Sequence, residues 1–261
     1  MRFSGLLVCL ALAAPLAVFA AEEHLKLDRM PADVNPNDPV SLQRGAQTYI
    51  NYCMGCHSLG YMRYNRLQDI GLSEQQIRDN LIFTGAKIGT LMTNAIAPKD
   101  AREWWTGAPP PDLSVIARSR ASSAGSGADW LYTYLRGFYR DPSRPSGWNN
   151  TVFQNVGMPH VLYQLQGEQA LKTEVKLLPR GSGKKEEALK IEETRLELEK
   201  PGTMTAVEYD RMVADLVNFL VYVSEPVKQF RQQLGFYVLI FLSVLFVLAY
   251  ALKKEFWKDV H

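Results

Sequence analysis

The stretch NYCMGCHSLGY, residues 51–61, places two cysteines and a histidine within five positions. Cys53 and Cys56 are two residues apart, and His57 follows directly. A C-x-x-C pair can belong to a zinc site, form a redox disulfide or, when a histidine follows, attach a c-type haem. Each of these uses makes a different demand on the rest of the chain.

The first twenty residues have the pattern of a secretory signal peptide, with Arg2 ahead of an apolar run over 6–17 and small residues near Ala20. We therefore expect cleavage of segment 1–20. The third cysteine of the chain, Cys9, would leave with this segment. An exported protein with only Cys53 and Cys56 has no disulfide framework.

The remaining sequence favours haem over zinc or a redox disulfide. A structural zinc site needs four ligands, usually from two separated pairs, and the chain beyond residue 20 has no second cysteine pair. A thioredoxin-like disulfide needs a βαβ setting, whereas a helix is expected to lead into Cys53. On a helical turn, positions i and i+3 share a face, so Cys53 and Cys56 can reach one porphyrin while His57 ligates its iron.

Helical spacing of apolar residues predicts a mainly α protein. Asp38 and Pro39 form a good helix start, and the segment from residue 39 runs as a helix into Cys53. A second amphipathic helix is expected close to the C-terminal end, stopping near Pro226. Shorter helices are expected at 74–82 and 129–137. The stretches 106–114 and 140–160 are irregular but aromatic, and we expect them to pack around something rather than to be solvent-exposed linkers.

The second axial ligand of such a haem has to come from elsewhere in the chain. Met158 lies in NVGMPH, where Gly157 permits a tight backbone and Pro159 stiffens the loop. A thioether ligand raises the reduction potential relative to a second histidine. Met92 and His160 remain as alternatives. Arg118 and Arg120 are candidate partners of the haem propionates, which need cationic neighbours.

Residues 234–252 form a run of nineteen residues without a charge. At about 1.5 Å per residue such a helix spans roughly 28 Å, close to the hydrocarbon thickness of a bilayer. We expect residues 21–233 to form an exported c-type haem domain, 234–252 a transmembrane helix and 253–261 a cytoplasmic tail. Within the domain, 168–200 carries eight acidic and eight basic residues and predicts a solvated charged hairpin or helical insert.

The whole chain has 29 basic and 27 acidic residues, a formal net charge of +2. This balance gives no basic excess of the kind that nucleic-acid binding requires, and export also argues against such a partner.

Four segments together resemble a known family. They are CMGCHSLGYMRYNRL (53–67), PPDLSVIARSR (110–120), DWLYTYLRGFYRDPSRPSGWNN (129–150) and NVGMPH (155–160). With the amphipathic helix and the C-terminal span, their order is similar to that of the cytochrome c1 family, the haem subunit of the bacterial cytochrome bc1 complex.

The resemblance implies a cytochrome c-like helical haem domain with long irregular insertions and one C-terminal transmembrane helix. It implies that Met158 is the sixth iron ligand and that Arg120 lies by a haem propionate. It further implies assembly with cytochrome b, electrons from the Rieske iron–sulfur protein, and a cytochrome c acceptor. The insert 168–200 is longer than in the mitochondrial members of the family.

The sequence thus predicts a non-catalytic electron-transfer subunit with one covalent haem c. We expect a single pass through the inner membrane, with the haem domain on the periplasmic side. Two rival interpretations are an independent membrane-anchored carrier and a haem enzyme or sensor with an open iron site. A labile sixth iron position, exposed by carbon monoxide binding, would distinguish the enzyme or sensor from both carriers.

Overall fold

The computed structural model describes residues 26–32, 34–105, 109–178 and 189–259. The predicted signal segment 1–20 lies outside the described residues. In chain order the elements are α1 (Pro39–Tyr52), β1 (Leu59–Arg63), the 3₁₀ helix η1 (Tyr64–Ile70), α2 (Glu74–Leu81), β2 (Leu91–Met92), α3 (Pro98–Trp104), α4 (Ile116–Ser119), α5 (Gly127–Arg136), β3 (Phe138–Arg140), β4 (Trp148–Asn150), α6 (Tyr163–Gln166), β5 (Gly167–Leu178), β6 (Leu189–Pro201), α7 (Ala206–Ser224) and α8 (Lys228–Phe256). The prediction of a mainly α fold is confirmed, and so are the four predicted helices, within two residues at each end.

Helices α1 and α7 pack against each other at the centre of the domain. Helix α1 begins as the sequence predicts, because the Asp38 side chain accepts a hydrogen bond from Val40 N and Pro39 occupies the first turn. The helices approach closely at Gly45, since a Cβ there would lie 2.6 Å from Phe219 Cβ. Only glycine allows this separation, so α1, which carries Cys53 at its end, is held directly against α7.

A buried carboxylate fixes the same pair of helices. Asp215 on α7 accepts from Ser41 Oγ at 2.6 Å and from Arg44 Nε at 2.6 Å, both on α1. The Asp215 side chain is 3 % exposed, whereas that of Arg44 is 45 % exposed. Asn218 also donates to Ser41 Oγ at 3.0 Å. A buried charge needs such partners, so this network sets the register of α1 along α7.

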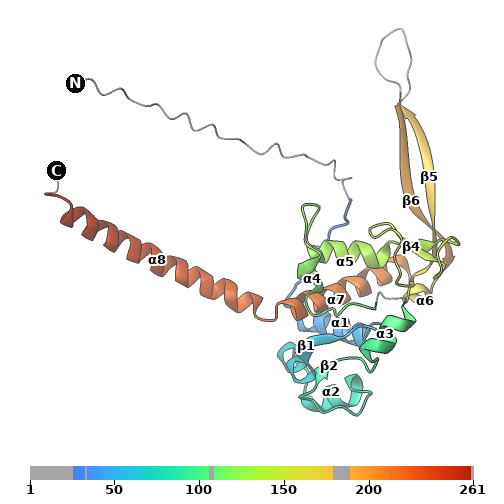
Figure 1. Cartoon of the computed structure of the whole chain (residues 1–261), viewed down its shortest axis with the longest axis horizontal. Coiled ribbons are helices and arrows are strands. Elements are labelled where there is room, and N and C mark those ends of the chain that lie inside the picture. The colour runs from blue at the N-terminus through green and yellow to red at the C-terminus, as the bar shows by residue number, and fades with distance from the viewer. Residues whose placement is uncertain (1–25, 33, 106–108, 179–188, 260–261) are drawn as a thin grey trace, which may run out of the picture.

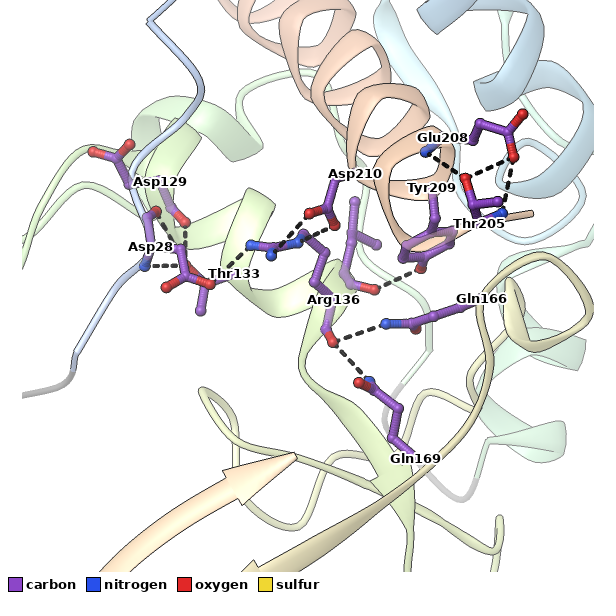
Figure 2. A network of polar contacts seen from close by, with 11 residues as sticks. Asp28, Asp129, Thr133, Arg136, Gln166, Gln169, Thr205, Glu208, Tyr209 and Asp210 are labelled. Carbon is purple, nitrogen blue, oxygen red and sulfur yellow. Dashed lines mark hydrogen bonds and ion pairs between the residues drawn. The ribbon is translucent and has the colours of Figure 1, made fainter. Parts of the chain in front are cut away.

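Helix α7 also contacts α4 and α5, and in Figure 1 it lies between α1 and α5. A capping box of Ser126 and Asp129 begins α5. A capping box of Thr205 and Glu208 begins α7, as Figure 2 shows. The main core is formed by α1, α5 and α7 together with residues of β1, η1, α2, β2 and α4, and a smaller cluster of Phe138, Trp148 and Val156 lies beside it.

Arg136, the last residue of α5, joins three parts of the fold (Figure 2). Its guanidinium donates to both carboxylate oxygens of Asp210 on α7, at 2.6 and 3.2 Å, and to Asp28 at 2.8 Å. Its carbonyl oxygen accepts from Gln166 Nε2 at 3.0 Å and from Gln169 Nε2 at 2.9 Å. The C-terminal end of α5 is therefore fixed to α7, to the N-terminal segment and to the base of β5.

The charged insert 168–200 is a hairpin rather than a helix. Strands β5 and β6 pair antiparallel from Gly167↔Pro201 to Leu178↔Leu189. The hairpin extends away from the helical domain in Figure 1. At its base, Glu168 accepts from Arg140 of β3 at 3.0 Å and from Lys200 at 3.2 Å. These ion pairs connect the hairpin to the domain.

Helix α8 follows α7 after a break at residues 225–227. It contains the predicted span 234–252, and it is the one helix of the described residues long and apolar enough to cross a membrane. None of its residues is buried against the domain. Figure 1 shows α8 leaving the helical domain as a separate rod. An apolar surface on all sides is typical of a helix that lies in lipid.

Candidate functional site: a haem attachment turn and a methionine loop

The turn after α1 brings both cysteines and His57 together. Cys53 caps α1, and its carbonyl oxygen accepts from Cys56 N at 3.1 Å and from His57 N at 2.8 Å. Both cysteines are free, Cys53 buried and Cys56 exposed. Burial raises the pKa of the Cys53 thiol to about 12.

A zinc site at this turn would need a cluster of metal-ligating side chains. Within the described residues, no group of three or more His, Cys, Asp or Glu side chains is arranged to hold a metal ion. Two thiols followed by one imidazole fit a haem, which needs two sulfurs and one protein nitrogen from this side.

The Nδ1 atom of the His57 ring is held by a hydrogen bond. Its Nδ1 lies 2.7 Å from the carbonyl oxygen of Pro111, which can only accept, so Nδ1 carries the proton. The lone pair of Nε2 is then available to a metal. Burial lowers the pKa of His57, which favours the neutral imidazole that ligation requires.

The loop that carries Pro111 is tied to the strand after His57. Asp112 accepts from Gly60 N at 2.7 Å and from Ser114 N at 2.7 Å. Leu113 N donates to the carbonyl oxygen of Ser58 at 2.9 Å. These bonds fix the Pro111 carbonyl, and through it the plane of the His57 ring.

A pocket of about 380 Å³ opens beside Cys56. Its lining includes Asn94, Trp105 and Pro110 together with Cys56. Asn94 donates from Nδ2 to the carbonyl oxygen of Cys56 at 2.6 Å. The attachment turn thus has a concave, partly aromatic surface next to one of its two thiols.

The structure separates the three candidates for the second axial ligand. Met92 is fully buried in β2 opposite Leu59, and the His160 ring is stacked on Phe138 at 4.9 Å and is 3 % exposed. Met158 alone is partly exposed, with its thioether sulfur 3.4 Å from the hydroxyl of Tyr134. A sulfur that is accessible and positioned by one donor fits an iron ligand better than two groups enclosed in the core.

The loop that leads to Met158 is organised by two buried asparagines of β4. Asn150 donates from Nδ2 to the Tyr134 carbonyl oxygen at 2.8 Å, and its Oδ1 accepts from Val152 N at 2.9 Å. Asn149 Oδ1 accepts from Asn155 N at 2.8 Å. Both asparagines are at most 7 % exposed, so the loop is anchored to α5 through the interior.

Arg120 lies against two aromatic rings. Its guanidinium carbon is 4.5 Å from the ring centre of Trp130 and 5.6 Å from that of Phe153. Trp130 stacks on Tyr134 at 4.8 Å, and Tyr134 contacts Met158. The structure therefore connects Arg120 to Met158 through two rings of α5.

Arg118, the other propionate candidate, is exposed, whereas Arg120 is half-buried. A cation that is partly shielded from water interacts more strongly with a propionate than an exposed one does. The geometry favours Arg120 over Arg118.

The candidate residues thus form two groups: an attachment turn (Cys53, Cys56, His57), and Met158 on the methionine loop after β4 with Tyr134 on α5 and Arg120 at the end of α4. Sequence reasoning named five of these residues and missed Tyr134. Its only sequence signal was an aromatic residue four positions after Trp130 on a helix. Sequence reasoning also missed Asn150.

Comparison with known proteins relates most of the chain to one family. Residues 33–84 and 85–260 match the Cytochrome C1 family. A protein of Nitrosomonas europaea named ammonia monooxygenase gamma subunit is 49 % identical over the whole of both chains. The cytochrome c1 of Allochromatium vinosum is 47 % identical over 98 % of each chain, and that of Cereibacter sphaeroides is 28 % identical over 85 % of this chain and 82 % of its own.

Proposed function

This chain belongs to the cytochrome c1 family, and from that premise we propose that it receives single electrons from the Rieske iron–sulfur protein and passes them to a cytochrome c. A cytochrome c1 is the membrane-anchored c-type cytochrome of the bc1 complex, and it carries one covalently attached haem c. In this chain α8 is the membrane anchor.

We assign the attachment of this haem to Cys53 and Cys56 and its two axial positions to His57 Nε2 and Met158 Sδ. The observation that carries this assignment is the 2.7 Å contact of His57 Nδ1 with Pro111, which leaves Nε2 available in a turn that also holds two free thiols. When bound, the haem supplies a one-electron iron couple. Because protein groups fill both axial positions, the site suits outer-sphere electron transfer.

The other residues of the site hold these ligands in place. Pro111 fixes the protonated nitrogen of His57, and Asn150 ties the methionine loop to α5. Arg120, oriented over Trp130, offers a cation to a propionate. Each of these roles is to bind or orient, and the proposed function requires no proton transfer.

We propose the inner membrane as the location, with residues 21–233 in the periplasm and 253–261 in the cytoplasm after removal of 1–20. The pattern of segment 1–20 supports this orientation. Fusion of alkaline phosphatase to the C-terminus tests it. An active phosphatase would place the C-terminus in the periplasm and contradict the proposal.

The test of the assembly is purification of the tagged full chain from gently solubilised membranes. Two b-type haems accompanying a covalent c-type haem, with the c-type haem reduced by added quinol, would support membership in a quinol-oxidising complex. A lone c-type haem that quinol does not reduce would indicate an independent carrier. Co-purification with an ammonia monooxygenase would instead indicate the assembly that the name of the relative in Nitrosomonas europaea describes.

The ligand assignment has a separate test in Met158→Ala. The reduced wild-type protein should not bind carbon monoxide, whereas the variant should bind it because its sixth position is open. Met204→Ala is the matched control, since Met204 is another partly buried methionine and lies just ahead of α7. A Met158→Ala protein that stays unreactive would contradict the assignment, and a reactive wild type would indicate an enzyme or sensor.

A further inference from the structure

The hydroxyl of Tyr134 is directed at the sulfur of Met158. The oxygen and sulfur lie 3.4 Å apart, with Tyr134 as donor, and Met158 follows it by 24 positions. A thioether sulfur has two lone pairs and is a weak acceptor. Donation from Tyr134 therefore occupies one lone pair and leaves the other for iron.

The ring of Tyr134 is held so that its hydroxyl cannot easily turn away. One face stacks on Trp130 at 4.8 Å with an interplanar angle of 12°, and Phe138 meets it edge-on at 5.1 Å. The Tyr134 carbonyl oxygen accepts from the buried Asn150. The guanidinium of Arg120 covers Trp130 in turn. The donor is thus pre-organised on α5.

We propose that Tyr134 positions and tunes the Met158 ligand: its hydrogen bond raises the reduction potential of the haem site and holds the sulfur toward the iron. This inference rests on the proposed function, because it requires Met158 to be a ligand. The physical reason is that hydrogen-bond donation withdraws electron density from sulfur. A sulfur that donates less electron density stabilises oxidised iron less. Reduced iron becomes relatively more stable, and the reduction potential rises.

The test is Tyr134→Phe in the haem-loaded full chain, which keeps the ring in its stack and removes only the hydroxyl. We expect its midpoint potential, measured by spectroelectrochemical titration, to shift below that of the wild type. The weak far-red band of ferric iron with a thioether ligand should also change in position or intensity. A potential and a band that both match the wild type would overturn the proposal.

Tyr163→Phe is the matched control. Tyr163 on α6 lies near the same cluster, with its ring 6.0 Å from that of Trp148, but it is exposed, and its hydroxyl accepts from the neighbouring Gln164. Its removal should leave the potential unchanged. An equal shift in this control would mean that any nearby hydroxyl has the effect, and would overturn a specific role for Tyr134.

A double-mutant cycle separates this inference from the ligand assignment. In a Met158→His background there is no thioether to accept the bond, so Tyr134→Phe should have no further effect on the potential. A shift that persists undiminished in this background would overturn the inference while leaving the haem assignment intact. If instead Met158→His itself leaves the potential and the far-red band unchanged, Met158 is not the ligand. The ligand assignment and the inference about Tyr134 are then both wrong.

The wild-type protein provides a second measurement should Tyr134→Phe not retain haem. The iron–sulfur stretching band in resonance Raman spectra should move when the hydroxyl proton is exchanged for deuterium. A band that is identical in light and heavy water would overturn the proposal without any variant.

Discussion

Replacing Gly45 by alanine adds one carbon at the tightest contact between α1 and α7. That carbon would lie 2.6 Å from Phe219 Cβ, and closer still to the backbone oxygen of Asp215. Ordinary van der Waals contact begins at 3.4 Å, so the contact with Phe219 alone requires a separation of about 0.8 Å, and the contact with the Asp215 oxygen requires more. The oxygen belongs to the main chain of α7 and cannot rotate away. The strain therefore falls on the whole helix pair.

The cost follows from two opposing effects. Overpacking of this kind typically costs about 1–3 kcal/mol, and a contact with backbone falls at the upper end. Alanine gains about 1 kcal/mol over glycine in a helix interior. We expect Gly45→Ala to lower the free energy of unfolding by about 2 kcal/mol, and Tm by roughly 4–8 °C for a protein of this size.

The measurement is thermal unfolding of the haem-loaded full chain in detergent, followed by circular dichroism. Gly89→Ala is the control, because a Cβ at position 89 meets no atom within 4 Å. The control should stay within about 1 kcal/mol of the wild type. A Gly45→Ala protein as stable as the control would refute the reasoning that close packing at this glycine joins α1 to α7.

Two further predictions concern charged groups. Arg44→Met leaves the buried carboxylate of Asp215 without its closest cation, so we expect the free energy of unfolding, measured by chemical denaturation, to fall by about 2 kcal/mol. The loss is not larger because Ser41 still donates to Asp215. In the control Arg78→Met, which removes an exposed ion pair, the loss should be about 0.5 kcal/mol or less. The Arg140 guanidinium holds the pKa of Glu168 down at about 2, below its ordinary 4.5. The stability that this pair gives the hairpin base is therefore present above pH 4.5 and lost as the pH falls toward 2. Hydrogen exchange of the hairpin base, corrected for intrinsic rates, should lose protection in that range, and Glu168→Gln should abolish the difference between pH 7 and pH 3.

Local patterns in the sequence predicted the helical frame of the fold. Helix α1 begins at the Asp38–Pro39 signal, and α7 follows the apolar spacing that ends near Pro226. Both signals are contained within one helix, where side-chain period and capping act over a few residues. The attachment turn could be predicted for the same reason, since Cys53, Cys56 and His57 are contiguous.

Contacts between distant segments could not be predicted in this way. Tyr134 and Asn150 position the methionine loop across 24 and 16 positions of sequence, and neither residue type nor spacing marks such a role. Likewise the sequence alone does not distinguish Arg118 from Arg120. In the structure, Arg120 contacts the rings of Trp130 and Phe153. The assignment of the five predicted site residues remains a prediction that the experiments above test.

The insert 168–200 illustrates a different limit. Its charges predicted a solvated segment, but they fit a helix as well as a hairpin. Leu171 pairs with Leu196 across the strands, and Thr173 pairs with Thr194 two residues further on, so these uncharged residues share one face of the hairpin. That two-residue period is a signal for strands, although the charged residues between hide it.

The three-residue break between α7 and α8 determines how far the haem domain can move from its anchor. Residues 225–227 extend at most about 10 Å, and Arg231 Nε donates to Glu225 at 2.6 Å across the break. A tether this short keeps the domain at the bilayer surface. A partner fixed in the same membrane therefore meets the domain within a thin layer at this surface, which raises the frequency of their encounters. A partner that arrives from solution has no such help, and its affinity must come entirely from the surface it meets.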